Sequence, residues 1–304
     1  MTTGARRNLR NGLLFVSPWI IGFAVFVVYP IGASLYYSLC DYSVLSDPVY
    51  IGAGNYVDLS HDRVFFRALR NTLIYTAVFV LLGQSVALLL AMLLNMRSRF
   101  VRLYRTLLYA PSLVPQIGAA VIWMWMFNTR YGPVNEAFHA LTRWLPASIR
   151  PDPPMWFNAQ DSAMNALVFM SLWSLGNVMV IYLAGLQDIP ASLLEAAEID
   201  GAGPAAKTIH VTVPMISPVM LFNGIMGIIG GLNTFAIPKM IYATERYHLG
   251  DSIMFYVMVL QREAFDNLRM GYASAMAWIL FVIVLGLTLL IIRLSTRYIY
   301  YEAK

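Results

Sequence analysis

The chain has 304 residues, of which 59% are hydrophobic and only 12% carry a charged side chain. Soluble globular proteins carry about 25% charged residues, so this composition excludes an ordinary water-soluble domain and indicates a chain that folds in a bilayer. The net charge of +5 is spread out, and its densest clusters flank apolar runs, which favours membrane orientation over nucleic-acid binding. Cys40 is the only cysteine, which excludes an intrachain disulfide and a thiolate metal cage.

Long apolar runs recur along the whole chain. A helix needs about 20 apolar residues to cross a bilayer, where no water satisfies the backbone. The predicted spans are 13–39, 71–95, 106–128, 162–186, 216–238 and 272–293. The first run is long enough to cross, so we expect it to be retained as a span and not cleaved as a signal peptide. The sequence predicts an all-α, six-span membrane protein with one domain over residues 1–304.

The basic residues orient these spans. The N-terminal tail holds three arginines, and the short loop after the second span holds Arg97, Arg99, Arg102 and Arg105 with no acidic residue. The positive-inside rule places both segments in the cytoplasm. Six spans then put both termini inside, and the loops 40–70, 129–161 and 239–271 outside.

One cytoplasmic segment, residues 187–213 between spans four and five, is called the elbow here. Ser192 and Glu195 have the spacing of a capping box, which begins a helix. Gly201 suits a left-handed C-terminal cap, and Pro204 suits the first turn of another helix. The elbow is therefore predicted to be a helix, a tight turn and a second helix.

The same segment resembles the EAA motif of binding-protein-dependent ABC importer permeases. The motif reads EAA, three residues, Gly, nine residues, then an aliphatic, any residue, an aliphatic and Pro. Here it is Glu195-Ala196-Ala197, Gly201 and Val211-x-Val213-Pro214, with every spacing kept. In that family the elbow docks in a groove of an ATPase subunit. The resemblance assigns docking to Glu195, Ala196, Ala197, Asp200, Gly201 and Ala202.

The resemblance runs nearly end to end and is to the carbohydrate-uptake branch, of the maltose and glycerol-phosphate permease type. Further matching stretches are Ser17-Pro18, Tyr29-Pro30, Ile51-Gly52-x-Gly54-Asn55-Tyr56, Asn71-Thr72, Tyr131-Gly132-Pro133-Val134-Asn135, Met155-Trp156-Phe157, Trp173, Gly271-Tyr272-Ala273-Ser274-Ala275 and Tyr300-Tyr301-Glu302. The usual Gly-Gly-Pro turn after span five is missing, and residues 242–247 stand in its place.

The resemblance implies a type I importer permease in the plasma membrane. Its expected partners are a sister permease in a heterodimer, an ATPase homodimer that binds ATP and Mg²⁺, an external solute-binding protein and membrane lipid. This chain itself is expected to bind no cofactor, no metal and no nucleic acid.

Polar side chains within spans are costly in lipid and tend to face the bundle interior or a water-filled path. The candidates are Gln84, Ser112, Gln116, Ser171, Ser174, Asn177, Asn223, Asn233 and Thr234. By comparison with the maltose permease, the sugar contacts are expected at Ser112, Gln116, Ser171, Ser174, Gly231 and Thr234, with Asn233 added by position. All are uncharged, which suits a neutral sugar. The alternative interpretation is that such residues only bond helices to one another.

No catalytic constellation is evident. The segment 201–208 approximates a phosphate-binding loop, but Ala206 replaces the second glycine and Pro204 removes a backbone donor. The chain is therefore predicted to be a transport subunit and not an enzyme. Import of a polyol or glycerol phosphate is an alternative. An ion-coupled secondary transporter would need ionisable residues within the spans, and an intramembrane hydrolase would need an acid–base set.

Overall fold

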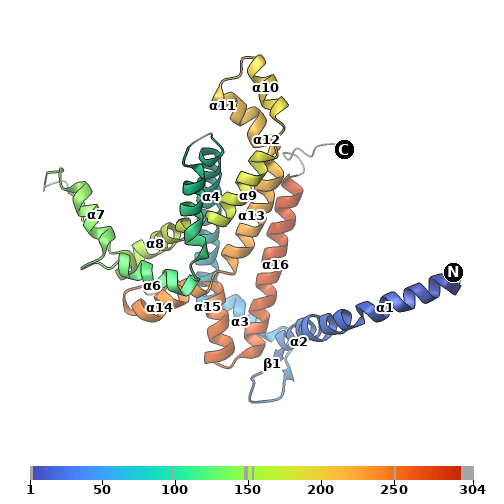
Figure 1. Cartoon of the computed structure of the whole chain (residues 1–304). Helices are drawn as coiled ribbons and strands as arrows, with labels where there is room; N and C mark the ends of the chain where they lie inside the picture. Colours follow the sequence, from blue (N-terminus) through green and yellow to red (C-terminus); the bar gives the residue numbers. More distant parts are fainter. Residues whose placement is uncertain (1–2, 97–98, 147–149, 153, 250, 296–304) are drawn as a thin grey trace. The chain divides into compact units, whose positions relative to one another are not determined.

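The computed structural model of the chain describes residues 3–96, 99–146, 150–152, 154–249 and 251–295. The Tyr300-Tyr301-Glu302 motif and Arg97 lie outside the described residues. The chain divides into two compact units, one of residues 1–62 with 260–282 and the other of residues 63–259 with 283–304. Figure 1 follows their elements along the sequence. Whether the chain acts as a single domain stays a prediction.

The first unit begins with a long helical segment and a small hairpin. Its elements are α1 (Thr3–Phe23), η1 (Ala24–Val28), α2 (Tyr29–Ser38), β1 (Cys40–Asp41), β2 (Val49–Tyr50), α3 (Gly54–His61), η5 (Arg262–Asp266) and the first turns of α16 (Met270–Ser295). The π-helical η1 ends two residues before Pro30, which lacks the N–H that would continue the α-helical ladder. The two short antiparallel strands depart from the all-helical prediction.

The hairpin is tied to its neighbours by Asn55 and Gly271. The Asn55 side-chain amide donates to the carbonyl oxygens of Ser38 at 3.0 Å and Cys40 at 2.8 Å. The Gly271 N–H donates to the Tyr42 carbonyl, and a Cβ at Gly271 would lie 2.1 Å from the Cys40 carbonyl oxygen. Both residues belong to stretches shared with the permease family, and here their role is structural.

The second unit contains the remaining helices. They are α4 (Arg63–Asn95), α5 (Val101–Tyr109), η2 (Ala110–Leu113), α6 (Gln116–Met126), α7 (Pro133–Thr142), η3 (Trp156–Asn158), α8 (Gln160–Trp173), α9 (Gly176–Gln187), α10 (Ala191–Ile199), α11 (Pro204–Lys207), η4 (Thr208–Thr212), α12 (Val213–Met215), α13 (Ser217–Leu232), α14 (Ala236–Leu249), most of α15 (Tyr256–Gln261) and the last turns of α16. The long helix α4 packs against α8, α9 and α13.

Two apolar cores hold this unit together. One gathers Trp123 of α6, Phe157 of η3 and aliphatic side chains of α8 around Phe127, with Ile241 from α14. The other lies between α4 and α9, around Met179 and Tyr182. Two family stretches also meet in this unit, since the Trp156 indole donates to the Asn135 side chain at 2.6 Å.

The predicted spans correspond to four segments that each count as one span and two pairs with a sharp bend. The four segments are Asn11–Ser38, Arg63–Asn95, Met270–Ser295 and Ser217–Ala243, the last interrupted without a sharp bend at residues 233–235. The predicted span 106–128 is instead the pair Val101–Leu113 and Gln116–Met126, bent by 100°. The predicted span 162–186 is the pair Ser162–Trp173 and Gly176–Gln187, bent by 49°. Six spans therefore result when each bent pair counts as one.

Candidate functional site

The elbow has the predicted shape of helix, turn and helix. Helix α10 ends at Ile199, and Gly201 follows with a left-handed φ of 79°. The N–H of Gly201 donates to the Glu198 carbonyl at 3.0 Å, and the N–H of Ala202 donates to the Ala197 carbonyl at 2.9 Å. These two bonds form a Schellman cap, so the turn is fixed by local backbone geometry. In Figure 1 the helices α10 and α11 lie side by side, joined by this turn.

The predicted capping box is wrong. Helix α10 starts at Ala191 with Pro190 as its N-cap, and no side chain caps it. Ser192 therefore lies inside the helix, because Pro190 already fixes the backbone in an extended conformation just before it. The second half of the prediction is confirmed, since Pro204 occupies the first turn of α11 after the extended Gly203.

Most of the six predicted docking residues lie on the surface of the elbow. Glu195, Ala196, Asp200 and Gly201 are exposed, whereas Ala197 and Ala202 are half-buried. Ile199 beside them is 86% exposed, which is unusual for an isoleucine in water. Lys207 forms an ion pair with Glu198 and braces α10 against the helix that follows. The surface thus offers small side chains, an exposed isoleucine and a carboxylate at Glu195.

The predicted sugar-contact residues lie beside three interruptions of the membrane helices, called the helix breaks. The breaks are residues 114–115, 174–175 and 233–235. Ser112 and Gln116 flank the first, Ser171 and Ser174 are at the second, and the third is next to Gly231 and includes both Asn233 and Thr234. A helix end leaves backbone carbonyls without partners, and in a membrane these groups must be buried in protein or line a water-filled cavity.

Two of the helix breaks are brought together around Tyr75 of α4. The Tyr75 hydroxyl lies 2.7 Å from the Ser171 hydroxyl, and the Thr234 side chain lies close to it. A Cβ at Gly231 would lie 2.8 Å from the side chain of Thr76, the next residue on α4. Ser171, Gly231 and Thr234 therefore gather on one stretch of α4.

The other predicted contacts lie apart from this cluster. Ser112 is close to Gly176 of α9, where a Cβ would lie 3.0 Å from the Ser112 hydroxyl. Gln116 is exposed at the start of α6. Trp173 packs edge-on against Trp123, with 5.8 Å between the ring centroids.

Most of these polar side chains bond to their own helix. The Ser171 hydroxyl donates to the Leu167 carbonyl, the Asn233 amide to the Ile229 carbonyl and the Thr234 hydroxyl to the Gly230 carbonyl. Such bonds satisfy carbonyls near the helix breaks. Each hydroxyl still has free acceptor capacity, so the same groups are able to receive hydrogen bonds from a hydroxylated solute.

A separate polar cluster joins three helices and was not predicted as a unit. The Gln84 amide of α4 donates to the Asn223 backbone carbonyl of α13 at 2.8 Å, and the Tyr182 hydroxyl of α9 donates to the Gln84 side-chain oxygen at 2.5 Å. We call Gln84, Tyr182 and Asn223 the polar node. Gln84 and Asn223 were candidates because they are polar residues in spans, but a tyrosine in an apolar run gives no such signal.

Two buried side chains near the helix breaks were also missed by sequence reasoning. The Thr76 hydroxyl and the Trp123 indole N–H are buried without a hydrogen-bond partner among the described residues. Threonine and tryptophan are ordinary in apolar helices, so nothing in the sequence distinguishes them. Among the described residues, no three His, Cys, Asp or Glu side chains are placed to hold a metal ion.

Comparison with known proteins identifies the family. Residues 63–299 match the family described as the binding-protein-dependent transport system inner membrane component. The chain belongs to this family. It is 35% identical to the probable ABC transporter permease protein YesP of Bacillus subtilis, over 98% of this chain and 94% of that protein. It is 32% identical to the sn-glycerol-3-phosphate transport system permease protein UgpA of Yersinia pestis, over 95% of each chain.

The fold is also found in a solved structure. The chain superposes with a TM-score of 0.82 on a chain of a bacterial alginate ABC transporter in complex with an alginate-bound periplasmic protein. That match covers 98% of this chain and 99% of the other, at 21% identity. The chain is therefore a multi-pass membrane permease subunit with the type I importer fold, and the resemblance stated from the EAA motif is confirmed.

Proposed function

We propose that this permease subunit forms half of the path for a sugar. We further propose that ATP hydrolysis in partner subunits drives transport and that the elbow transmits their motion to this chain. The observation that carries the proposal is the Schellman turn at Gly201, which holds the EAA residues in a defined and exposed shape. A rigid elbow between α9 and α13 transmits displacement to two membrane helices. This chain hydrolyses nothing itself; ATP and Mg²⁺ are bound by the ATPase homodimer that docks on Glu195, Ala196, Ala197, Asp200, Gly201 and Ala202.

The proposed sister permease is supported by the first span. None of the apolar window in Asn11–Ser38 is buried within the chain. In the same unit, a groove of about 400 Å³ is lined mainly by apolar residues of α2 and α16, including Ile31, Trp278 and Phe281. Lipid or another membrane helix must cover these surfaces, and a second permease supplies such helices. With both termini inside, the solute-binding protein docks on the opposite side.

The sugar assignment is supported by the uncharged path residues Ser112, Gln116, Ser171, Ser174, Gly231, Asn233 and Thr234. Hydroxyl, amide and backbone groups match the hydrogen-bonding capacity of a polyhydroxylated solute, whereas a phosphorylated solute favours arginine or lysine. The second candidate is glycerol phosphate, the solute in the name of the relative UgpA. Lys239 favours it, because this residue falls within the segment Ser217–Ala243, five residues after Thr234.

The coupling proposal is tested in the reconstituted four-subunit complex. Gly201→Asp should abolish solute-stimulated ATP turnover, because it disturbs the docking turn, while Gly203→Asp adds the same charge two residues later at an ordinary extended backbone position. Assembly is checked by co-purification. If Gly201→Asp assembles and transports like the parent protein, the elbow is not the coupling element.

The solute is tested with the partner binding protein. Neutral oligosaccharides, polyols and glycerol 3-phosphate are compared by thermal shift of that protein and by uptake into proteoliposomes. A sugar should give both shift and uptake, and Lys239→Met should leave that uptake unchanged. Uptake of glycerol 3-phosphate that Lys239→Met abolishes contradicts the sugar assignment.

A further inference from the structure

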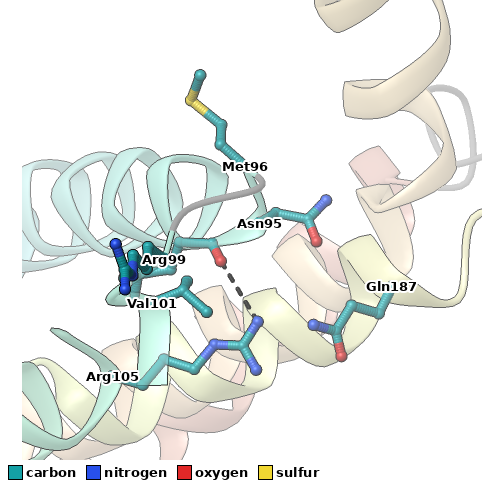
Figure 2. Close-up of a pocket in the computed structure, with 7 residues that line it drawn as sticks. Asn95, Met96, Arg99, Val101, Arg105 and Gln187 are labelled. Atoms are coloured by element: carbon teal, nitrogen blue, oxygen red, sulfur yellow. Dashed lines mark hydrogen bonds between the residues drawn. The ribbon is translucent and has the colours of Figure 1, made fainter. Parts of the chain in front are cut away.

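A basic pocket lies where α4 ends and α5 begins, and none of its lining residues is a predicted docking or sugar-contact residue. Its volume is about 520 Å³, and it is lined by Leu94, Asn95, Met96, Arg99, Val101, Arg105 and Gln187. Figure 2 shows Asn95, Arg105 and Gln187 around one space, with Met96 pointing away from it. Its lining contains two arginines, two amides and no acidic residue. Asp188, the next residue after Gln187, is exposed and does not line the pocket.

Arg105 is only partly satisfied by protein. One guanidinium nitrogen, Nη2, donates to the Leu94 carbonyl at 3.3 Å and caps the end of α4 (Figure 2). Its Nε is buried and has no hydrogen-bond partner among the described residues. The ion pairs found among those residues include neither Arg105 nor Arg99. A half-buried guanidinium without a counter-charge is matched by an anion with several acceptor oxygens, and a phosphate group is such an anion.

The surroundings of the pocket favour a lipid as the source of this phosphate. Helix α5 is amphipathic, because Leu103 and Leu107 are exposed at 54% and 58% while Arg105 lines the pocket. Leu93 at the end of α4 is 62% exposed. Apolar side chains beside a basic pocket match acyl chains below a head group, as on interfacial helices. A soluble anion or a carboxylate of a partner subunit makes no use of these leucines.

We propose that this pocket binds the phosphodiester head group of an anionic membrane lipid, with Arg99 and Arg105 on the phosphate and the amides of Asn95 and Gln187 on its ester or glycerol oxygens. Gln187 ends α9 and begins the elbow, so the bound lipid joins α4, α5 and the start of the elbow at one point. The inference concerns lipid recognition and does not depend on which solute is carried.

The test uses the assembled complex in nanodiscs of equal dioleoyl phosphatidylglycerol and dioleoyl phosphatidylcholine, with retained lipid counted by native mass spectrometry. Arg99→Gln should lower retained phosphatidylglycerol about fivefold, the effect of one basic residue at an anionic surface. Arg102→Gln is the matched control, since Arg102 is exposed nearby at the start of α5 and does not line the pocket. It should lower retention less than twofold.

Arg105 requires a second variant, because Arg105→Gln also removes a helix cap. Arg105→Lys keeps the charge but loses the planar fork, so it should lower phosphatidylglycerol retention while co-purification of the complex is unchanged. Equal loss in Arg99→Gln and Arg102→Gln would show diffuse attraction and overturn the proposal. Displacement of the lipid by 10 mM inorganic phosphate would identify a soluble-anion site and overturn the lipid assignment. Loss of the ATPase subunit with unchanged lipid retention would instead identify a protein contact.

Discussion

The elbow and the helix bundle of α4, α9 and α13 are stabilised in different ways. The elbow keeps its shape through bonds between near neighbours, namely the two backbone bonds of the Schellman turn and the ion pair of Lys207 with Glu198. The bundle depends on residues far apart in the sequence. Gln84 bonds to Asn223 and Tyr182, and Gly176 allows the backbone of α9 to approach Tyr109 closely.

Because of this difference, the two regions should contribute differently to the stability of the chain. The elbow contributes little apolar burial, and its exposed surface is available for a partner. The bundle contributes buried contacts, and a change there should be felt throughout the unit. Changes in the bundle are therefore expected to lower the stability of the chain, whereas changes in the elbow should lower coupling at unchanged stability. The predictions below test this contrast, and the expected change in stability decreases from one to the next.

Gly176→Ala should give the largest loss of stability. The new Cβ would lie 2.9 Å from the Tyr109 Cα and 3.0 Å from the Leu108 carbonyl oxygen, so backbone has to move. Overpacking of this kind costs up to about 3 kcal/mol. Gly118→Ala is the control, because a Cβ there meets nothing within 4 Å and alanine favours a helix. The unfolding temperature of the complex should fall for Gly176→Ala only. A similar fall in both variants would contradict the packing argument.

Tyr182→Phe should lower stability by a smaller amount, about 1 kcal/mol, because it leaves the half-buried Gln84 side-chain oxygen without its donor. Tyr104→Phe removes a hydroxyl from an exposed tyrosine and should change little. A double-mutant cycle with Gln84→Leu measures the pair directly, and the double variant should cost less than the sum of the two singles. If the stability losses of the two single variants simply add in the double variant, the Tyr182–Gln84 bond does not stabilise the bundle.

Gly201→Ala should change coupling more than stability. A left-handed alanine costs about 1–2 kcal/mol, and the penalty acts on the turn alone because no atom lies within 4 Å of the new Cβ. We expect the ratio of transported solute to hydrolysed ATP to fall, while the unfolding temperature falls less than it does in Gly176→Ala. Gly201→Asn should restore coupling, since asparagine tolerates this backbone region, and Gly203→Ala should have no effect. An equal loss in Gly203→Ala would contradict the backbone explanation.

The same contrast explains what the sequence could predict. The turn at Gly201 and the start of α11 at Pro204 depend on one residue each, so they were predicted correctly. The capping box at Ser192 failed because Pro190 takes the N-cap position, two residues earlier than the pattern required. Apolar length located all six membrane segments, but it gave no sign that two of them are bent, although Pro115 and Gly176 stand next to the bends.

Pairing between distant residues was beyond sequence reasoning. The polarity of Gln84, Asn223, Ser171 and Thr234 marked them as candidates, but their partners on other helices depend on how the helices pack. Tyr75 and Tyr182 gave no signal at all, because tyrosines in apolar runs usually anchor or pack. The six docking residues and seven path residues remain predictions of function, and their positions are now known.

Ile199→Ser should have the smallest effect on stability, close to zero, because the side chain is already 86% exposed in the chain alone. If a partner covers α10, removing this side chain should weaken binding of the ATPase subunit about tenfold, since a buried isoleucine contributes about 1.5–3 kcal/mol. Leu141→Ser on α7 is the control, with a leucine that is 73% exposed on the side predicted to face outward. Titration of the ATPase subunit onto permease in nanodiscs measures both. Equal affinity of the two variants would place the docking surface elsewhere, and the exposed face of α10 would then have no assigned partner.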